Sequence, residues 1–187
     1  GCGRARARHH AGTGRDTVSL DAGYCLIRPW RRGDRAALVR QADNRRVWLL
    51  LRDQFPHPYT PADADAWLTH VAQQRPMTSF AIAVGGEAAG GIGVAPQRDV
   101  HRRSAEVGYW LGEAFWNRGI MTAAVRRFTA YAFDAYDLIR IYASVFSSNP
   151  ASMRVLEKAG YTREGVLRRS VVKDGQVLDQ ILYAVTR

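Results

Sequence analysis

The sequence has few cysteines and no long apolar run. Its 187 residues include only two cysteines, Cys2 and Cys25, too few for a disulfide framework or a cysteine-based zinc site. No apolar stretch approaches the roughly 18 residues that cross a membrane. The arginines near the N-terminus are not followed by the apolar segment of a secretory signal. These absences predict a cytoplasmic protein with no metal site and no membrane association.

Acidic residues are also scarce relative to basic ones. Seventeen Asp and Glu stand against 27 Lys and Arg, which gives a net charge of +10. Such a surface suits nucleic acid, the ribosome or an anionic cofactor, although solvated arginines are the simpler interpretation. Residues 1–19 lack hydrophobic periodicity and are predicted to be a flexible basic tail. Residues 20–187 are long enough for one domain with a sizeable core.

Two common nucleotide-binding signatures are missing. The chain contains neither Gly-x-Gly-x-x-Gly nor a glycine followed by Lys-Ser/Thr, which excludes a Rossmann site and a P-loop. Residues 116–124 (WNRGIMTAA) nevertheless read as a short loop that enters an amphipathic helix. Gly119 can adopt a turn conformation without Cβ strain, and the first helical N–H groups have no intrahelical partners. This segment therefore predicts a seat for a pyrophosphate-bearing cofactor.

The order of the remaining elements predicts a mixed α/β sheet. Strands are predicted at 24–30, 78–84, 88–95, 103–111, 139–146, 161–171 and 177–185. Helices are predicted at 34–42, 48–51 and 60–74, after Gly119, and at 149–160, with Asp34, Thr60 and Asn149 as N-caps. The hairpins favour antiparallel pairing, whereas the helix between strands 103–111 and 139–146 favours a parallel pair.

Several segments, in order and spacing, resemble the GNAT acyltransferases, and within them the RimJ/RimL-like group. They are residues 27–30 (IRPW), 105–111 (AEVGYWL), 115–122 (FWNRGIMT), 149–161 (NPASMRVLEKAGY) and 165–168 (GVLR). The resemblance spans about residues 24–186. It implies a GNAT fold, a mixed and mostly antiparallel sheet flanked by helices, whose central parallel strands splay apart for acetyl-CoA.

The resemblance also implies how acetyl-CoA, the cosubstrate, would bind. Its pantetheine arm would pair with backbone near Trp110 and Leu111 as an added strand does, and Asn149 would hydrogen-bond that arm while capping its helix. Its pyrophosphate would rest on backbone amides of the loop, from Asn117, Arg118, Gly119, Ile120, Met121 and Thr122. Two positions of the loop depart from the family pattern: Met121 stands where the family has a second small residue, and Arg118 where it has a lysine- or glutamine-like residue. Because the expected contacts are backbone N–H groups, these departures should not prevent binding.

Three side chains are candidates for the acyl-transfer chemistry. Glu106 matches the place of a family acid that acts as general base through water; its alternative role is a strand residue in a salt bridge to Arg103 or Arg140. Ser152 would contact or protonate the CoA sulfur, or is a surface serine. Tyr161 would be the general acid, or a packed aromatic residue.

The acceptor is predicted to be a primary amine, either a protein N-terminal α-amine or a small molecule. About a tenth of an α-amine of pKa about 8 is neutral near pH 7, against under about 0.1% for lysine. A ribosomal protein is one candidate, although Val171 stands where such relatives can carry an acidic residue.

The sequence says less about the walls of the acceptor site. Trp48, Phe55, His57 and Tyr59 either form its walls or belong to the core. Dimers are common in the family, so a homodimer is a further expectation. The alternative function is a catalytically inactive module that binds CoA or associates with RNA or the ribosome.

Overall fold

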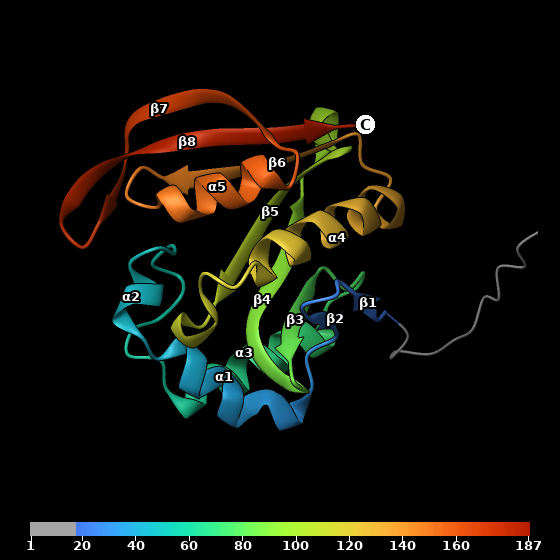
Figure 1. Cartoon of the computed structure of the whole chain (residues 1–187), viewed down its shortest axis with the longest axis vertical. Helices are drawn as coiled ribbons and strands as arrows, with labels where there is room; N and C mark the ends of the chain where they lie inside the picture. The colour runs from blue at the N-terminus through green and yellow to red at the C-terminus, as the bar shows by residue number, and fades with distance from the viewer. Residues whose placement is uncertain (1–17) are drawn as a thin grey trace, which may run out of the picture.

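The computed structural model describes residues 18–187 (Figure 1). Residues 1–17, most of the predicted tail, lie outside the described residues. Val18, which that prediction included, is half-buried and packs against the core.

One eight-stranded sheet organises the described chain. Its strand order is β1-β2-β3-β4-β5-β6-β8-β7, and every neighbouring pair is antiparallel except β5 and β6. The strands are β1 (Leu20–Asp21), β2 (Leu26–Arg28), β3 (Ser79–Val84), β4 (Glu87–Pro96), β5 (Ser104–Leu111), β6 (Arg140–Phe146), β7 (Thr162–Lys173) and β8 (Gln176–Thr186). This arrangement confirms the predicted mixed sheet and its parallel pair.

Five α-helices accompany the sheet in the described residues. They are α1 (Arg35–Ala42), α2 (Arg45–Trp48), α3 (Pro61–Gln73), α4 (Ile120–Ala135) and α5 (Pro150–Lys158). Thr60 caps α3, where its hydroxyl accepts the N–H of Asp63, whose carboxylate in turn accepts the Thr60 N–H. Asn149 caps α5 as predicted.

Three N-terminal predictions need correction. The strand predicted at 24–30 is shorter, and β1, too short for a periodic pattern, was missed. The short helix predicted at 48–51 lies instead at Arg45–Trp48 and shares only Trp48 with the prediction, because the Asn44 side chain caps it by accepting the N–H groups of Arg46 and Val47. Asp34 precedes α1 but makes no side-chain cap.

The Asp34 carboxylate has another partner. Its two oxygens accept the Arg28 guanidinium at 2.8 Å each, and both side chains are buried. One oxygen also accepts the Arg31 N–H at 2.8 Å. This bidentate pair joins β2 to the segment that leads into α1. Removing either side chain would be costly, because the other charge would remain buried without a partner.

The two faces of the sheet pack against different helices. Phe80 and Ile82 of β3 belong to the main core cluster, together with residues of α4 and α5, whereas Ala81 lies in a separate cluster with Ala37 of α1. Figure 1 shows α4 and α5 on the viewer's side of the sheet. Tyr109 of β5 packs against the main cluster, and Trp110 packs on the cluster of α1 and α3. The predicted alternation along β5 is therefore confirmed.

The β4 strand packs tightly through its glycines. A Cβ built on Gly90 would overlap the Trp110 carbonyl oxygen and lie 2.9 Å from the Leu111 Cα. Backbone atoms cannot rotate away as a side chain can, so Gly90 lets β4 and β5 approach here.

We expect Gly90→Ala to lower the free energy of unfolding by about 1–3 kcal/mol, because overpacking must be relieved by backbone shifts. Gly108→Ala in β5 is the matched control, since a Cβ there meets nothing within 4 Å, and its effect should stay within about 0.5 kcal/mol. Urea unfolding of both variants checks this. Equal stability of the two variants would contradict the close approach at Gly90.

Candidate functional site

The parallel strands β5 and β6 separate in the middle of the sheet. Their pairing covers only Ser104↔Arg140, Ala105↔Ile141 and Glu106↔Tyr142. Beyond these residues β5 continues beside β4 to Leu111, and β6 continues beside β8 to Phe146. Figure 1 shows the two strands diverging. Among residues 18–187, no strand pairs with the β6-facing side of β5 from residue 107 onward, which leaves backbone groups there to pair with an extended ligand.

The loop before α4 has the geometry of an anion seat. Asn117 and Gly119 both adopt left-handed conformations, with φ of 58° and 74°. This conformation suits glycine and is tolerated by asparagine. The sixteen-residue helix α4 begins at Ile120, so the N–H groups of Ile120, Met121 and Thr122 in its first turn lack intrahelical partners. The predicted pyrophosphate seat is thus a left-handed turn that leads directly into a helix N-terminus.

Ser152 lies on the side of the sheet covered by α4 and α5. Its hydroxyl shares a 2.7 Å hydrogen bond with the Tyr109 hydroxyl of β5. Its N–H donates to the Asn149 side-chain oxygen at 3.1 Å. Burial raises the pKa of Tyr109 far above its ordinary value, although the bond to Ser152 opposes that shift. Tyr109 therefore stays protonated at neutral pH and forms a hydroxyl pair with Ser152.

Tyr161, the candidate general acid, is a buried residue, and Tyr109, which was not among the predicted site residues, is the tyrosine that contacts Ser152. The Tyr161 hydroxyl shares a 2.7 Å hydrogen bond with Thr129 of α4, and the side chain is buried. Burial raises the pKa of Tyr161 to about 12. These contacts match the packed-aromatic alternative. The tyrosine hydroxyl that contacts Ser152 belongs to Tyr109, which sequence analysis treated only as an apolar-face residue.

Glu106 projects from the opposite face of β5. Its carboxylate forms an ion pair with Arg52, in the segment between α2 and α3, and its side chain is 19% exposed. The partners considered from sequence were different: Arg103 pairs with Asp137, and Arg140 with Glu164. No local pattern links Arg52 to Glu106, which lie 54 positions apart.

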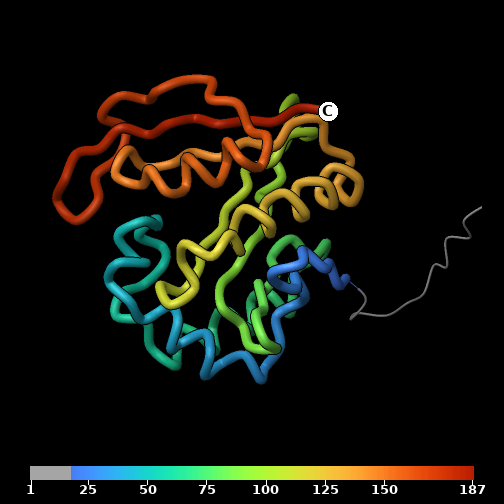
Figure 2. Tube along the Cα trace, viewed as in Figure 1, coloured from blue at the N-terminus to red at the C-terminus, as the bar shows by residue number. Residues whose placement is uncertain are grey.

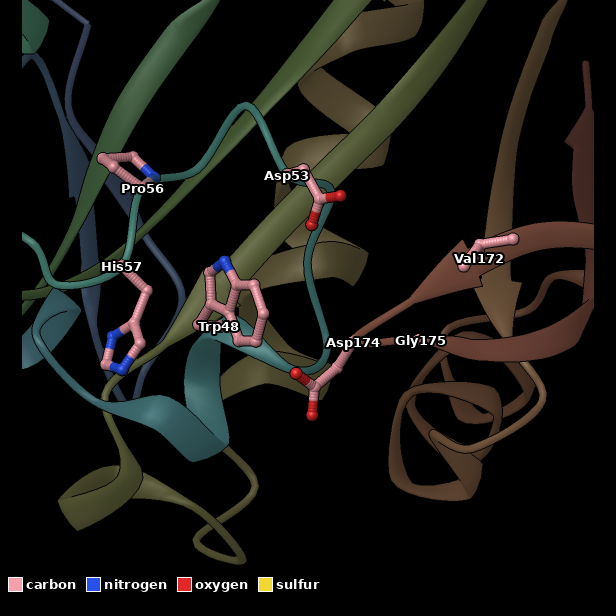
Figure 3. Close-up of a pocket in the computed structure, with 7 residues that line it drawn as sticks. All are labelled: Trp48, Asp53, Pro56, His57, Val172, Asp174 and Gly175. Carbon is pink, nitrogen blue, oxygen red and sulfur yellow. The ribbon is translucent and has the colours of Figure 1, made fainter.

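Two adjoining hollows open on this same side. The larger has a volume of about 540 Å³ and the smaller about 330 Å³, and Asp53 and Val172 line both. The larger is also lined by Trp48, Pro56, His57, Asp174 and Gly175 (Figure 3). The smaller is also lined by Arg52, Phe146, Val171 and Gln180. Arg52, the partner of Glu106, thus connects the carboxylate with the hollows.

The four aromatic residues considered as walls divide between two environments. Trp48 and His57 stack with ring centroids 5.5 Å apart and line the larger hollow. Tyr59 is 5% exposed, and Phe55 packs on both Tyr59 and Trp110. Phe55 and Tyr59 therefore support the site from the core.

Some features bear on the kind of site. Within residues 18–187, no helix combines the length and apolar character needed to cross a membrane. The same residues contain no group of three or more His, Cys, Asp or Glu side chains placed to hold a metal ion.

Comparison with known proteins identifies the family. The family model described as an acetyltransferase (GNAT) domain matches residues 25–162, and the chain therefore belongs to this family. A solved structure of Mycobacterium smegmatis RimJ in complex with CoA-disulfide superposes with a TM-score of 0.78 and 29% identity, covering 90% of this chain and 86% of that one. The GNAT fold predicted from the sequence is confirmed.

Curated relatives share shorter regions. An uncharacterized N-acetyltransferase of Bacillus subtilis, YoaA, is 37% identical over 101 residues, which are 54% of this chain and 56% of that protein. The [ribosomal protein uS5]-alanine N-acetyltransferase of Escherichia coli is 31% identical over 98 residues, 51% of this chain and 50% of that protein. The chain spans about half the length of the curated relatives it matches.

We expect Gly119→Asp to weaken the binding of CoA by at least about tenfold, because a carboxylate at this helix N-terminus repels the pyrophosphate. Gly119→Asn is the matched control: it imposes a similar left-handed strain without charge and should retain most of the affinity. Isothermal calorimetry with CoA measures both. Unchanged affinity in the aspartate variant would refute the placement of the pyrophosphate.

Proposed function

We propose that this protein transfers an acetyl group from acetyl-CoA to a primary amine by direct attack on the thioester. The observation that carries the proposal is the placement of two sets of groups on opposite faces of the diverging strands. Glu106 and the hollows lie on one face, whereas Ser152 and Tyr109 lie on the other. A thioester held between β5 and β6 would meet the amine from one side and lose its thiol on the other.

The donor would be held mainly by backbone groups. The pyrophosphate would rest on amides of residues 117–122, and the pantetheine would pair with the open side of β5 near Trp110 and Leu111. The Asn149 side-chain oxygen already accepts the Ser152 N–H, so its amide nitrogen would be the group free to bond the pantetheine arm. Positioning the thioester in this way supplies much of the rate enhancement expected of a transferase.

Glu106 would act as the general base on the acceptor side. The acceptor amine must be neutral to attack, and a water between it and the Glu106 carboxylate would carry its proton away. Arg52, which lines the smaller hollow, forms an ion pair with this carboxylate. Backbone N–H groups of β5 near Trp110 would polarise the thioester carbonyl.

Ser152 would protonate the leaving group on the other side. As the amine nitrogen forms its bond to the acetyl carbon, the carbon–sulfur bond breaks and the sulfur takes up negative charge. The Ser152 hydroxyl, oriented by its hydrogen bond with Tyr109, would donate its proton to that sulfur and regain one from solvent, to which Glu106 returns the proton of the amine. The products are an amide and CoA with a free thiol, so atoms and charge balance.

The acceptor we favour is a protein N-terminal α-amine, including that of a ribosomal protein. Two observations support it. The E. coli relative is named for an alanine of ribosomal protein uS5, and an α-amine supplies more neutral nucleophile at neutral pH than lysine does. The adjoining hollows of about 540 and 330 Å³ offer room for residues that follow the reacting amine.

An acetylation screen tests this function. We expect acetyl-CoA to be consumed with short peptides that carry a free N-terminus, and not with the same peptides blocked at the N-terminus and bearing an internal lysine. Free-thiol release and mass spectrometry measure the reaction. A protein that binds CoA or RNA but acetylates no peptide, polyamine or aminoglycoside would instead be the inactive module.

Replacing the proposed base tests the mechanism. We expect Glu106→Gln to lower kcat about a hundredfold, a typical effect of general-base loss, while the affinity for acetyl-CoA stays unchanged. Arg52→Gln is the control, because it breaks the same ion pair and keeps the carboxylate, and it should retain most of kcat. Steady-state kinetics with an N-terminal peptide separate the two. If both variants lose the same activity, Glu106 acts only through the ion pair.

A further inference from the structure

Lys173 is a buried cation behind the hollows: it lines neither of them itself, but its neighbours Val172 and Asp174 and its contact partners Trp48 and Asp53 do. It is one of only two lysines among the chain's 27 basic residues, the other being Lys158. Its side chain is 3% exposed, although it ends a strand beside the β7–β8 turn. The ammonium donates to the Asp53 carboxylate at 2.7 Å and lies 3.5 Å from the centre of the Trp48 ring. A carboxylate and an aromatic face together form a seat for an ammonium group.

The same contacts join two distant parts of the chain. Figure 2 shows the β7–β8 hairpin reaching beyond the rest of the sheet toward the segment around α2. Asp174 at the hairpin tip pairs with Arg45 of α2 at 2.6 Å. Figure 3 shows Trp48 and Asp53 on one side of the larger hollow, with Val172, Asp174 and Gly175 on the other. Lys173 and Arg45 therefore connect the two walls.

These pairings determine the charge that the hollows present. In the described part of the chain, two carboxylates line them, Asp53 and Asp174, and each is paired with an internal cation. The neighbouring Glu106 is paired with Arg52. What remains is the stacked Trp48–His57 surface and the apolar side chains of Val172 and Phe146. A second ammonium on an acceptor would therefore meet lining carboxylates that already have a cation partner.

We infer that Lys173 is a specificity-determining residue: it occupies the cation seat of Trp48 and Asp53 and so makes the acceptor site select amines with an uncharged, apolar remainder over polycations. This inference rests on the proposed function, which identifies the hollows with the acceptor site. The Lys173 ammonium would exclude a ligand's ammonium in two ways: it repels the like charge, and it occupies the groups that would otherwise bind it. Specificity of this kind comes from repulsion of the wrong ligand as well as from fit to the right one. Asp53 is 72% exposed on its side chain, so removing Lys173 would leave a solvated carboxylate that an external cation could use.

The test compares two ligands that differ by one ammonium. Hexylamine and hexamethylenediamine are titrated by calorimetry into the full chain with CoA present, so that binding is read whether or not catalysis occurs. Wild type should bind hexylamine more tightly. Lys173→Met should shift the ratio of the two dissociation constants toward the diamine by about five- to tenfold, the size expected for a carboxylate together with an aromatic face.

Matched variants make the outcome specific. Lys158→Met, at an exposed helical lysine, and Lys173→Arg, which keeps the charge, should leave the ratio unchanged. Lys173→Met combined with Asp53→Asn should lose the shift. Asp53→Asn alone, which does not depend on the fold tolerating a new methionine, should weaken diamine binding further. An unchanged ratio in folded Lys173→Met, a shift that survives Asp53→Asn, or a single Asp53→Asn variant that gains diamine affinity would each overturn the inference.

The proposed function fails in a different way. If wild type acetylates no amine but the calorimetric ratios change as expected, the catalytic proposal is wrong and the cation seat stands. If wild type acetylates N-terminal peptides but the ratios do not respond to Lys173→Met, acyl transfer stands and the role of Lys173 is refuted.

Discussion

The end of β5–β6 pairing at Glu106↔Tyr142 is the constraint on which the rest of the site depends. Each strand keeps its other neighbour, β4 or β8, so the sheet remains continuous while its centre opens. The opening exposes backbone on β5 at the point where its side chains alternate between two helical layers. As a result Glu106 and Tyr109, three residues apart, face opposite sides of the same gap. The proposed direct transfer places a base on one side of this gap and an acid on the other.

Charge pairing then distinguishes the two sides. The proposed donor side contains the backbone amides at Gly119 and α4 and the neutral hydroxyl pair of Ser152 and Tyr109. On the proposed acceptor side, ion pairs tie the α2 region to the sheet and to the β7–β8 hairpin through Glu106, Lys173 and Asp174. Of these pairs, only Arg45–Asp174 has both side chains exposed, and such a pair adds little stability. The proposed effect of all three pairs is on which charges a ligand meets.

Local signals predicted much of the fold, including the turn and the helix starts on which the proposed donor side depends. The left-handed Gly119, the Asn149 cap and the alternation along β5 all depend on residues close in sequence, and each is confirmed. The contacts that sequence reasoning missed join distant residues: Tyr109 to Ser152, Arg52 to Glu106 and Asp53 to Lys173 are 43, 54 and 120 positions apart. Arginine is so frequent in this chain that composition could not single out Arg52. Tyr109 stands at a core-facing position of a strand, and that position gives no sign that its hydroxyl has a hydrogen-bond partner.

A crystal structure of the protein with CoA tests the central claim most directly. The account predicts pantetheine between β5 and β6 beyond the Glu106↔Tyr142 pair, the pyrophosphate on the amides of residues 117–122, and the sulfur within hydrogen-bonding reach of Ser152. CoA bound elsewhere, or strands β5 and β6 paired through to Leu111 and Phe146 in the complex, would contradict it.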